Sequence, residues 1–217
     1  MSPRFDAYVF DLDGTLLDTM DDFVAVTNTT LAQMGSKRTY TRQEILDCFQ
    51  RGGIVVLLQE ELGQELPEEK GKEVYRTWYG TFAEHGLEHT NLYPHVKETL
   101  TALKAQGAKL AVLSNKRDED AKMTINHFFP GIFDAVHGES PDYPRKPNPQ
   151  GLLNTMEELG VTAHETAYVG DSAGDVRVAQ ATGAFAVAVE YGYGTNGNIG
   201  ETNPDALISQ FDQLLSL

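Results

Sequence analysis

Two aspartates separated by one residue follow an apolar run near the start of the chain. Tyr8, Val9 and Phe10 read as a buried strand, and Asp11 and Asp13 come directly after it. In an open parallel α/β sheet, ligands bind beyond the carboxyl ends of the strands, so two carboxylates at this place could act as a nucleophile and its acid–base partner. An Asx turn that ends the strand is the structural alternative.

Three later apolar runs also end in residues that suit phosphate chemistry. These residues are Ser114 and Asn115 after the run at 110–113, Lys146 after the run at 133–136, and Asp171 after the run at 167–169. Each pattern alone is typical of ordinary helix capping. Helical patterns at 94–106, 118–128 and 150–159 separate the runs, which predicts an α/β fold with a doubly wound parallel sheet. In such a sheet the four strand ends would converge on one site.

The motifs, in this order, resemble those of the haloacid dehalogenase superfamily, and specifically its phosphatases. They read Asp-Leu-Asp-Gly-Thr at 11–15, Ser-Asn at 114–115, Lys-Pro at 146–147 and Gly-Asp-Ser-Ala-Gly-Asp at 170–175. The resemblance spans nearly the whole chain and is loose between about residues 18 and 92. It implies a Rossmann-like α/β core with an inserted helical cap.

The resemblance also implies a role for each motif residue. Asp11 would attack phosphorus to form an aspartyl-phosphate, and Asp13 would protonate the leaving alcohol and later activate water. Lys146 would offset the repulsion between Asp11 and a dianionic phosphate. The residues expected to bind the phosphate are Thr15, Ser114, Asn115 and Lys146.

Mg²⁺ is the cofactor that this chemistry implies, because it prefers oxygen ligands and neutralises phosphate charge. By resemblance its ligands are Asp11, the backbone carbonyl of Asp13, and Asp171. Asp175 lies one helical turn beyond Asp171. If a helix starts between them, the Asp175 carboxylate would face the same crevice and orient metal-bound water or Lys146.

The segment after the first motif reads as a separate helical bundle. We expect an α/β core at residues 1–17 and 91–217 and a cap of about four helices at 18–90. The segment around Arg51 resembles the part of the cap that reaches into the active site in relatives. Arg51 could therefore contact a second anionic group of the substrate, or it could equally be a surface residue. Trp78, with Tyr75, Tyr79 and Phe82, reads as the buried stripe of a helix.

Composition limits the partners. The chain has 217 residues, 32 of them acidic and 17 basic, which gives a formal charge of -15. This charge disfavours nucleic acid and anionic membrane surfaces, so a small phosphorylated metabolite is the expected partner. No segment reaches the roughly 20 apolar residues that span a bilayer, and no signal region is present. We expect a cytoplasmic protein, monomeric or homodimeric.

Within the superfamily the pattern looks most like the phosphoglycolate phosphatases, with pyrophosphatases, sugar-phosphate phosphatases and 5′-nucleotidases as alternatives. Asp13 argues against dehalogenation, which needs no acid for the leaving halide. Phe23 stands where β-phosphoglucomutases carry a histidine, which disfavours a mutase. A signalling receiver domain uses similar residues in a different order, and a silent phosphate-binding module would not need Asp11, Asp13, Lys146 and Asp171 intact.

Overall fold

The computed structural model of the chain describes residues 4–51, 54–194 and 199–217. The chain forms two compact units. The core unit comprises Met1–Asp18 and Leu92–Leu217, and the helical unit comprises Thr19–Asn91. Strands β2 (Leu17–Asp18) and β3 (Asn91–Leu92) pair in a small sheet of their own, where the chain passes between the units.

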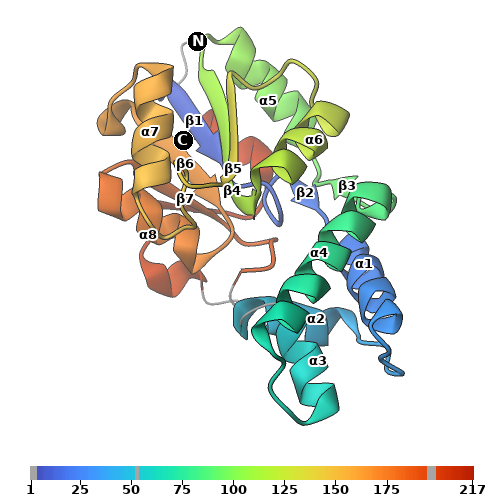
Figure 1. Ribbon diagram of the computed structural model, residues 1–217. Helices are drawn as coiled ribbons and strands as arrows, with labels where there is room; N and C mark the ends of the chain where they lie inside the picture. The colour runs from blue at the N-terminus through green and yellow to red at the C-terminus, as the bar shows by residue number, and fades with distance from the viewer. Residues whose placement is uncertain (1–3, 52–53, 195–198) are drawn as a thin grey trace. The chain divides into compact units, whose positions relative to one another are not determined.

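Within the described ranges, the main sheet of the core unit has six strands (Figure 1). They are β1 (Ala7–Phe10), β4 (Lys109–Arg117), β5 (Ala135–Glu139), β6 (Thr166–Gly170), β7 (Phe185–Val189) and β8 (Ala206–Ile208). Their order is β5-β4-β1-β6-β7-β8, and neighbouring strands run parallel. The sheet extends from β1 in both directions, which confirms the predicted doubly wound parallel sheet.

Helices cover both faces of this sheet (Figure 1). They are α5 (Val96–Ala105), α6 (Asp118–Phe128), α7 (Gln150–Leu159), α8 (Ala173–Thr182) and the short 3₁₀ helices η1 (Ala163–Glu165), η2 (Ile199–Thr202) and η3 (Phe211–Ser216). Tyr8 and Phe10 pack in one hydrophobic cluster with side chains of α5, α6 and η3. Ala7 and Val9 pack in a second cluster with α7 and α8. Burial on both faces explains why the strands are almost continuously apolar.

The helical unit contains four helices in the part that the structure describes. They are α1 (Met20–Gln33), α2 (Arg42–Arg51), α3 (Ile54–Leu62) and α4 (Glu68–His85). Trp78 and Phe82 are buried as predicted, and the Trp78 indole donates a hydrogen bond to Thr27 Oγ1 at 3.0 Å. Tyr75, which we predicted to be buried with them, is 36% exposed. That part of the prediction is wrong, because Tyr75 lies at the edge of the buried stripe, where its ring stacks on the half-buried Tyr79.

None of the helices described by the structure has both the length and the apolar composition that crossing a membrane requires.

Candidate active site

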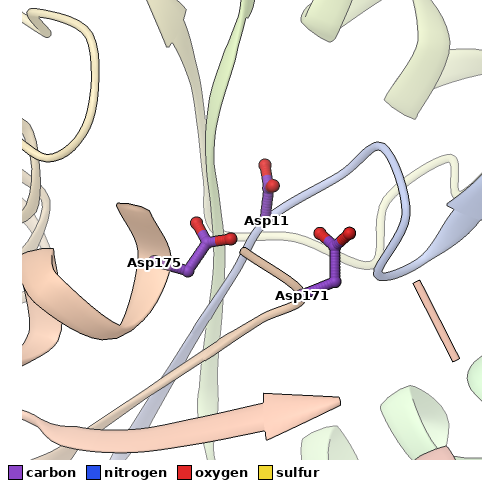
Figure 2. A group of neighbouring side chains, drawn as sticks. All are labelled: Asp11, Asp171 and Asp175. Atoms are coloured by element: carbon purple, nitrogen blue, oxygen red, sulfur yellow. The ribbon is translucent and has the colours of Figure 1, made fainter. Parts of the chain in front are cut away.

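Three aspartates meet at the carboxyl edge of the main sheet among the residues that the structure describes (Figure 2). Asp11 follows β1, Asp171 follows β6, and Asp175 lies in the first turn of α8. One carboxylate oxygen of each lies within 4.8 Å of the others, and all three residues are buried. The strand register produces this meeting, because Phe10 pairs with Val169 and the two strands end side by side.

Asp171 is fixed by the loops on either side of it. Its Oδ1 accepts a hydrogen bond from Thr15 Oγ1 at 3.2 Å, and its Oδ2 accepts from the backbone N–H groups of Tyr193 and Gly194 at 2.7 and 2.9 Å. Gly14 approaches from the β1 side with a φ of +85°, and a Cβ there would overlap the Asp171 carboxylate. Glycine is therefore required at position 14 for both its backbone conformation and the close approach.

Lys146 is a buried cation that contacts two of the three aspartates, Asp11 and Asp175. Its Nζ lies 2.9 Å from Asp11 Oδ1 and 2.6 Å from Asp175 Oδ1, and only 2% of its side chain is exposed. The same ammonium donates to the Tyr168 hydroxyl at 2.9 Å. The backbone N–H of Lys146 donates to Asn115 Oδ1 at 2.7 Å. Lys146 is therefore held at both its backbone and its charged end.

Asp175 connects the start of helix α8 to Lys146. Its Oδ2 accepts from the Ser172 N–H and hydroxyl at 2.9 and 2.6 Å, and the Asp175 N–H donates back to Ser172 Oγ at 3.3 Å. This reciprocal pair is a capping box, which begins the helix expected between Asp171 and Asp175. We considered two roles for Asp175, to orient metal-bound water or to orient Lys146. The structure contains the contact that the second role requires.

The buried carboxylates carry more negative charge than Lys146 balances. Burial, with the charges of Asp11 and Asp175, raises the pKa of Asp171 to about 8. Burial also raises the pKa of Asp11 to about 6, although Lys146 acts in the opposite direction. Burial lowers the pKa of the Lys146 ammonium, but the charges of Asp11 and Asp175 outweigh burial and hold this pKa well above its usual value. A divalent cation would relieve this repulsion, and a donor set made only of oxygens suits Mg²⁺.

Asp13 is paired with a lysine that our sequence analysis did not single out. Lys116 Nζ lies 2.9 and 3.0 Å from the two Asp13 carboxylate oxygens. The two side chains are 6% and 16% exposed, respectively. The available signal was position, because Lys116 directly follows Ser114 and Asn115 at the end of β4. A lysine in such a place is usually solvated, so the sequence alone did not separate it from a surface residue.

The contacts of the remaining predicted site residues in the core unit are also described. Thr15 is fully buried and donates to Asp171, while Ser114 is buried with its Oγ accepting from the Lys116 N–H at 3.2 Å. Asn115 contacts the Lys146 backbone. Arg51 is the last residue of α2 in the helical unit, and its side chain lies outside the described part of the structure.

Three further residues at the site were missed by our sequence analysis. Tyr168 is a fully buried β6 residue whose hydroxyl accepts from Lys146 and donates to the Leu113 carbonyl at 2.8 Å. Nothing in its apolar run distinguishes it from a core residue. Tyr193 and Gly194 follow β7, and their position after a strand was a usable signal, since β7 lies next to β6.

Comparisons with known proteins show which proteins this chain resembles. The family model described as haloacid dehalogenase-like hydrolase matches residues 8–189, a span that includes Asp11, Lys146, Asp171 and Asp175. The phosphoglycolate phosphatase of Mannheimia succiniciproducens is 30% identical over 225 residues, covering 100% of both chains. That of Haemophilus influenzae is 31% identical, also covering 100% of both. A crystal structure of a predicted phosphoglycolate phosphatase from Haemophilus somnus matches with a TM-score of 0.89 at 29% identity, covering 98% of this chain and 97% of that one.

Proposed function

Because the chain belongs to the haloacid dehalogenase-like hydrolase family, we propose that it is a phosphatase that hydrolyses phosphomonoesters at the carboxyl edge of its main sheet. The observation that carries the proposal is the buried contact of Asp11 Oδ1 with Lys146 Nζ, at 2.9 Å, beside Asp171. A carboxylate nucleophile needs compensation of charge to approach a phosphate dianion, and this cluster supplies it.

Asp11 is the proposed nucleophile. Its carboxylate attacks phosphorus, the bond from phosphorus to the ester oxygen breaks, and an aspartyl-phosphate forms. Water then attacks the phosphorus of this intermediate and releases inorganic phosphate, which restores the Asp11 carboxylate. Lys146 provides a fixed positive charge beside Asp11 in both steps, because its contacts with Asp175 and Tyr168 hold its ammonium there.

Asp13 is the proposed acid and base. It gives a proton to the leaving ester oxygen in the first step and takes one from the attacking water in the second. Both aspartates extend from the end of β1, two residues apart. This spacing supports a division of roles in which one carboxylate attacks phosphorus and the other serves the departing or attacking oxygen.

The residues of the site fit Mg²⁺. We propose Asp11, Asp171 and the backbone carbonyl of Asp13 as its ligands. We assign Asp175 to orienting Lys146, since the ammonium 2.6 Å from Asp175 Oδ1 would repel a cation there and Asp175 Oδ2 accepts from Ser172. When bound, Mg²⁺ would supply positive charge that stabilises the transferring phosphate oxygens. The contacts of Asp171 with Thr15, Tyr193 and Gly194 hold its carboxylate ready for this role.

Phosphate oxygens would be bound by the polar residues after β4. Ser114 and Asn115 are the proposed donors, and helix α6 follows them at Asp118 with its positive N-terminal end. Thr15 is proposed as a further contact, although its hydroxyl also serves Asp171. Arg51 is retained as a proposed contact to a second anionic group.

The favoured substrate is phosphoglycolate, a small phosphorylated metabolite of the cytoplasm. Support comes from the full-length relatives at 30% and 31% identity, which are phosphoglycolate phosphatases. The formal charge of -15 also favours a small substrate over nucleic acid. Pyrophosphate, sugar phosphates and nucleoside monophosphates are the alternative substrates.

Phosphate release from a panel of these esters, with and without Mg²⁺, tests the proposal. We expect Mg²⁺-dependent release that is greatest for phosphoglycolate and is abolished in Asp11→Asn. Asp142→Asn, which alters an exposed aspartate, serves as the matched control and should keep wild-type activity. Faster turnover of another ester would keep the mechanism and change the substrate. Full activity in Asp11→Asn would refute the assignment of the nucleophile.

A further inference from the structure

We propose that Tyr193 is a positioning residue for Asp171, and that the contact of its hydroxyl with Asp18 raises the affinity of the site for a divalent cation. This inference rests on the proposed phosphatase function, in which Asp171 is a metal ligand. Tyr193, Asp171 and Asp18 all belong to the core unit. The proposed coupling between them therefore lies within one compact unit.

The segment at residues 191–194 lies directly on Asp171. It reads Tyr-Gly-Tyr-Gly and follows strand β7. A Cβ added at Gly192 or Gly194 would overlap atoms of Asp171, so both glycines are needed for this close approach. The approach brings the backbone N–H groups of Tyr193 and Gly194 to 2.7 and 2.9 Å from Asp171 Oδ2. The orientation of the carboxylate therefore depends on where this backbone is held.

Tyr193 contacts Asp171 and Asp18 with opposite ends of the same residue. Its backbone N–H donates to Asp171 Oδ2 at 2.7 Å, and its hydroxyl donates to Asp18 Oδ1 at 2.9 Å. A tyrosine side chain has a rigid ring and only two torsions, so a fixed hydroxyl restricts rotation of the backbone that carries the N–H. The hydroxyl contact therefore limits how far this N–H can turn away from Asp171.

Asp18 is a firm anchor for the Tyr193 hydroxyl. Leu17, the residue before it, is fully buried, and the Leu17 carbonyl accepts from the Gly14 N–H at 2.9 Å. Asp18 is also the last residue of the core unit before the chain enters the helical unit. A change in the backbone at this boundary would therefore reach Asp171 through Tyr193.

Hydrogen bonds that orient a metal ligand strengthen metal binding, because a side chain that is already ordered loses less freedom when the ion binds. Loss of such a hydrogen bond typically weakens metal affinity by about 10- to 100-fold. The hydroxyl of Tyr193 acts on Asp171 through the Tyr193 backbone, one step further from the metal. We therefore expect an effect at the lower end of this range.

The Mg²⁺ affinity of four proteins tests this coupling: the wild type, Tyr193→Phe, Asp18→Ala and the double variant. The melting temperature of each is measured in increasing concentrations of Mg²⁺ without substrate, and its dependence on concentration gives the dissociation constant. Tyr193→Phe removes the hydroxyl and keeps the ring and the backbone N–H. We expect it to raise the dissociation constant by about tenfold when Asp18 is present. In the Asp18→Ala background it should have a much smaller effect, because the Asp18 acceptor is already missing.

Three further variants separate this coupling from other effects. Asp18→Asn keeps an acceptor oxygen for the Tyr193 hydroxyl, so it should weaken Mg²⁺ binding less than Asp18→Ala does. Tyr40→Phe is the matched control, since the Tyr40 hydroxyl also donates to a carboxylate, Glu61 Oε2, at 3.0 Å but within the helical unit. This variant should keep the wild-type dissociation constant. Asp171→Asn removes the charge of the proposed ligand and so measures Mg²⁺ that binds elsewhere on the acidic chain.

The melting temperatures and the phosphate-release panel distinguish failure of this inference from failure of the proposed function. An unchanged dissociation constant in Tyr193→Phe, or an equal loss of affinity with and without Asp18, would overturn the role of Tyr193. Equal stabilisation of Asp171→Asn and the wild type by Mg²⁺ would overturn it too, since Asp171 would then not be a ligand. Release of phosphate from no ester of the panel would reject the proposed function and this inference with it.

Discussion

Lys146 Nζ lies 2.6 Å from Asp175 Oδ1, and the two side chains are 2% and 1% exposed. This contact joins two segments far apart in sequence, the loop before α7 and the first turn of α8. It also completes a chain of contacts from the Ser172 cap through Asp175 and Lys146 to Asp11. The orientation of the central lysine thus depends on how helix α8 begins.

Replacing Lys146 by methionine should destabilise the protein. Methionine fills a similar volume but leaves Asp11 and Asp175 buried without the ammonium between them, and breaking a buried ion pair costs about 3–5 kcal/mol. Urea unfolding monitored by circular dichroism would measure the change in the free energy of unfolding. Lys122→Met removes a lysine from an exposed ion pair and should shift it by less than about 1 kcal/mol. Equal stability of the two variants would show that the buried contacts contribute little.

Asp175→Asn should lower activity, and it should destabilise the protein less than Lys146→Met does, because Lys146 keeps its contact with Asp11. The amide preserves shape and can still accept from Ser172, so the capping box can persist, but the negative charge beside Lys146 is lost. Loss of a residue that orients a catalytic group typically reduces activity by about 10- to 100-fold. Steady-state kinetics with phosphoglycolate would measure this, with thermal unfolding as the control for folding. Unchanged kcat and KM would remove Asp175 from the proposed machinery.

The main sheet was predictable because its signals are local. The central strands β1 and β6 are buried on both faces and read as short apolar runs, and the polar residues after the four predicted runs mark the functional edge. The edge strand β8 was not predicted, because it is short and its Leu207 is 46% exposed. The role of Tyr168 was not predictable, because it depends on Lys146 arriving from another loop. The Asp13 contact of Lys116 likewise depends on the pairing of β1 with β4. Sequence patterns indicate where strands end, but tertiary pairing decides which side chains meet there.

Gly14→Ala should destabilise the protein by more than the backbone strain at position 14 alone would. Gly14 has a φ of +85°, and an added Cβ would overlap Asp171. Gly107 has a φ of +95° with nothing within 4 Å of an added Cβ, so Gly107→Ala measures the backbone strain alone, about 1–2 kcal/mol. We expect Gly14→Ala to lose more stability than this control. It should also raise the Mg²⁺ concentration needed for half-maximal activity, whereas Gly107→Ala should not. Equal effects of the two substitutions would contradict a required close approach to Asp171.

The stability of the metal-free protein should fall as the pH rises. The folded state raises the pKa of Asp11 to about 6 and that of Asp171 to about 8, above the ordinary value of 3.8. Between about pH 4 and pH 8 the folded state therefore holds more protons than the unfolded state, so its advantage is complete at low pH and is lost as the pH rises through these values. Other carboxylates, whose pKa values are lowered by their contacts, act in the opposite direction below this range.

Urea unfolding in EDTA at pH 5.5, 6.5, 7.5 and 8.5 would measure this dependence. We expect the free energy of unfolding to decrease across the series, and Asp171→Asn to flatten the decrease, because the amide does not ionise. Mg²⁺ binds the ionised carboxylates, so its addition should stabilise the wild type most at the upper end of the series. A wild-type stability that rises with pH in EDTA, or a stabilisation by Mg²⁺ that Asp171→Asn retains in full, would exclude Asp171 as the buried carboxylate that releases its proton to admit the metal.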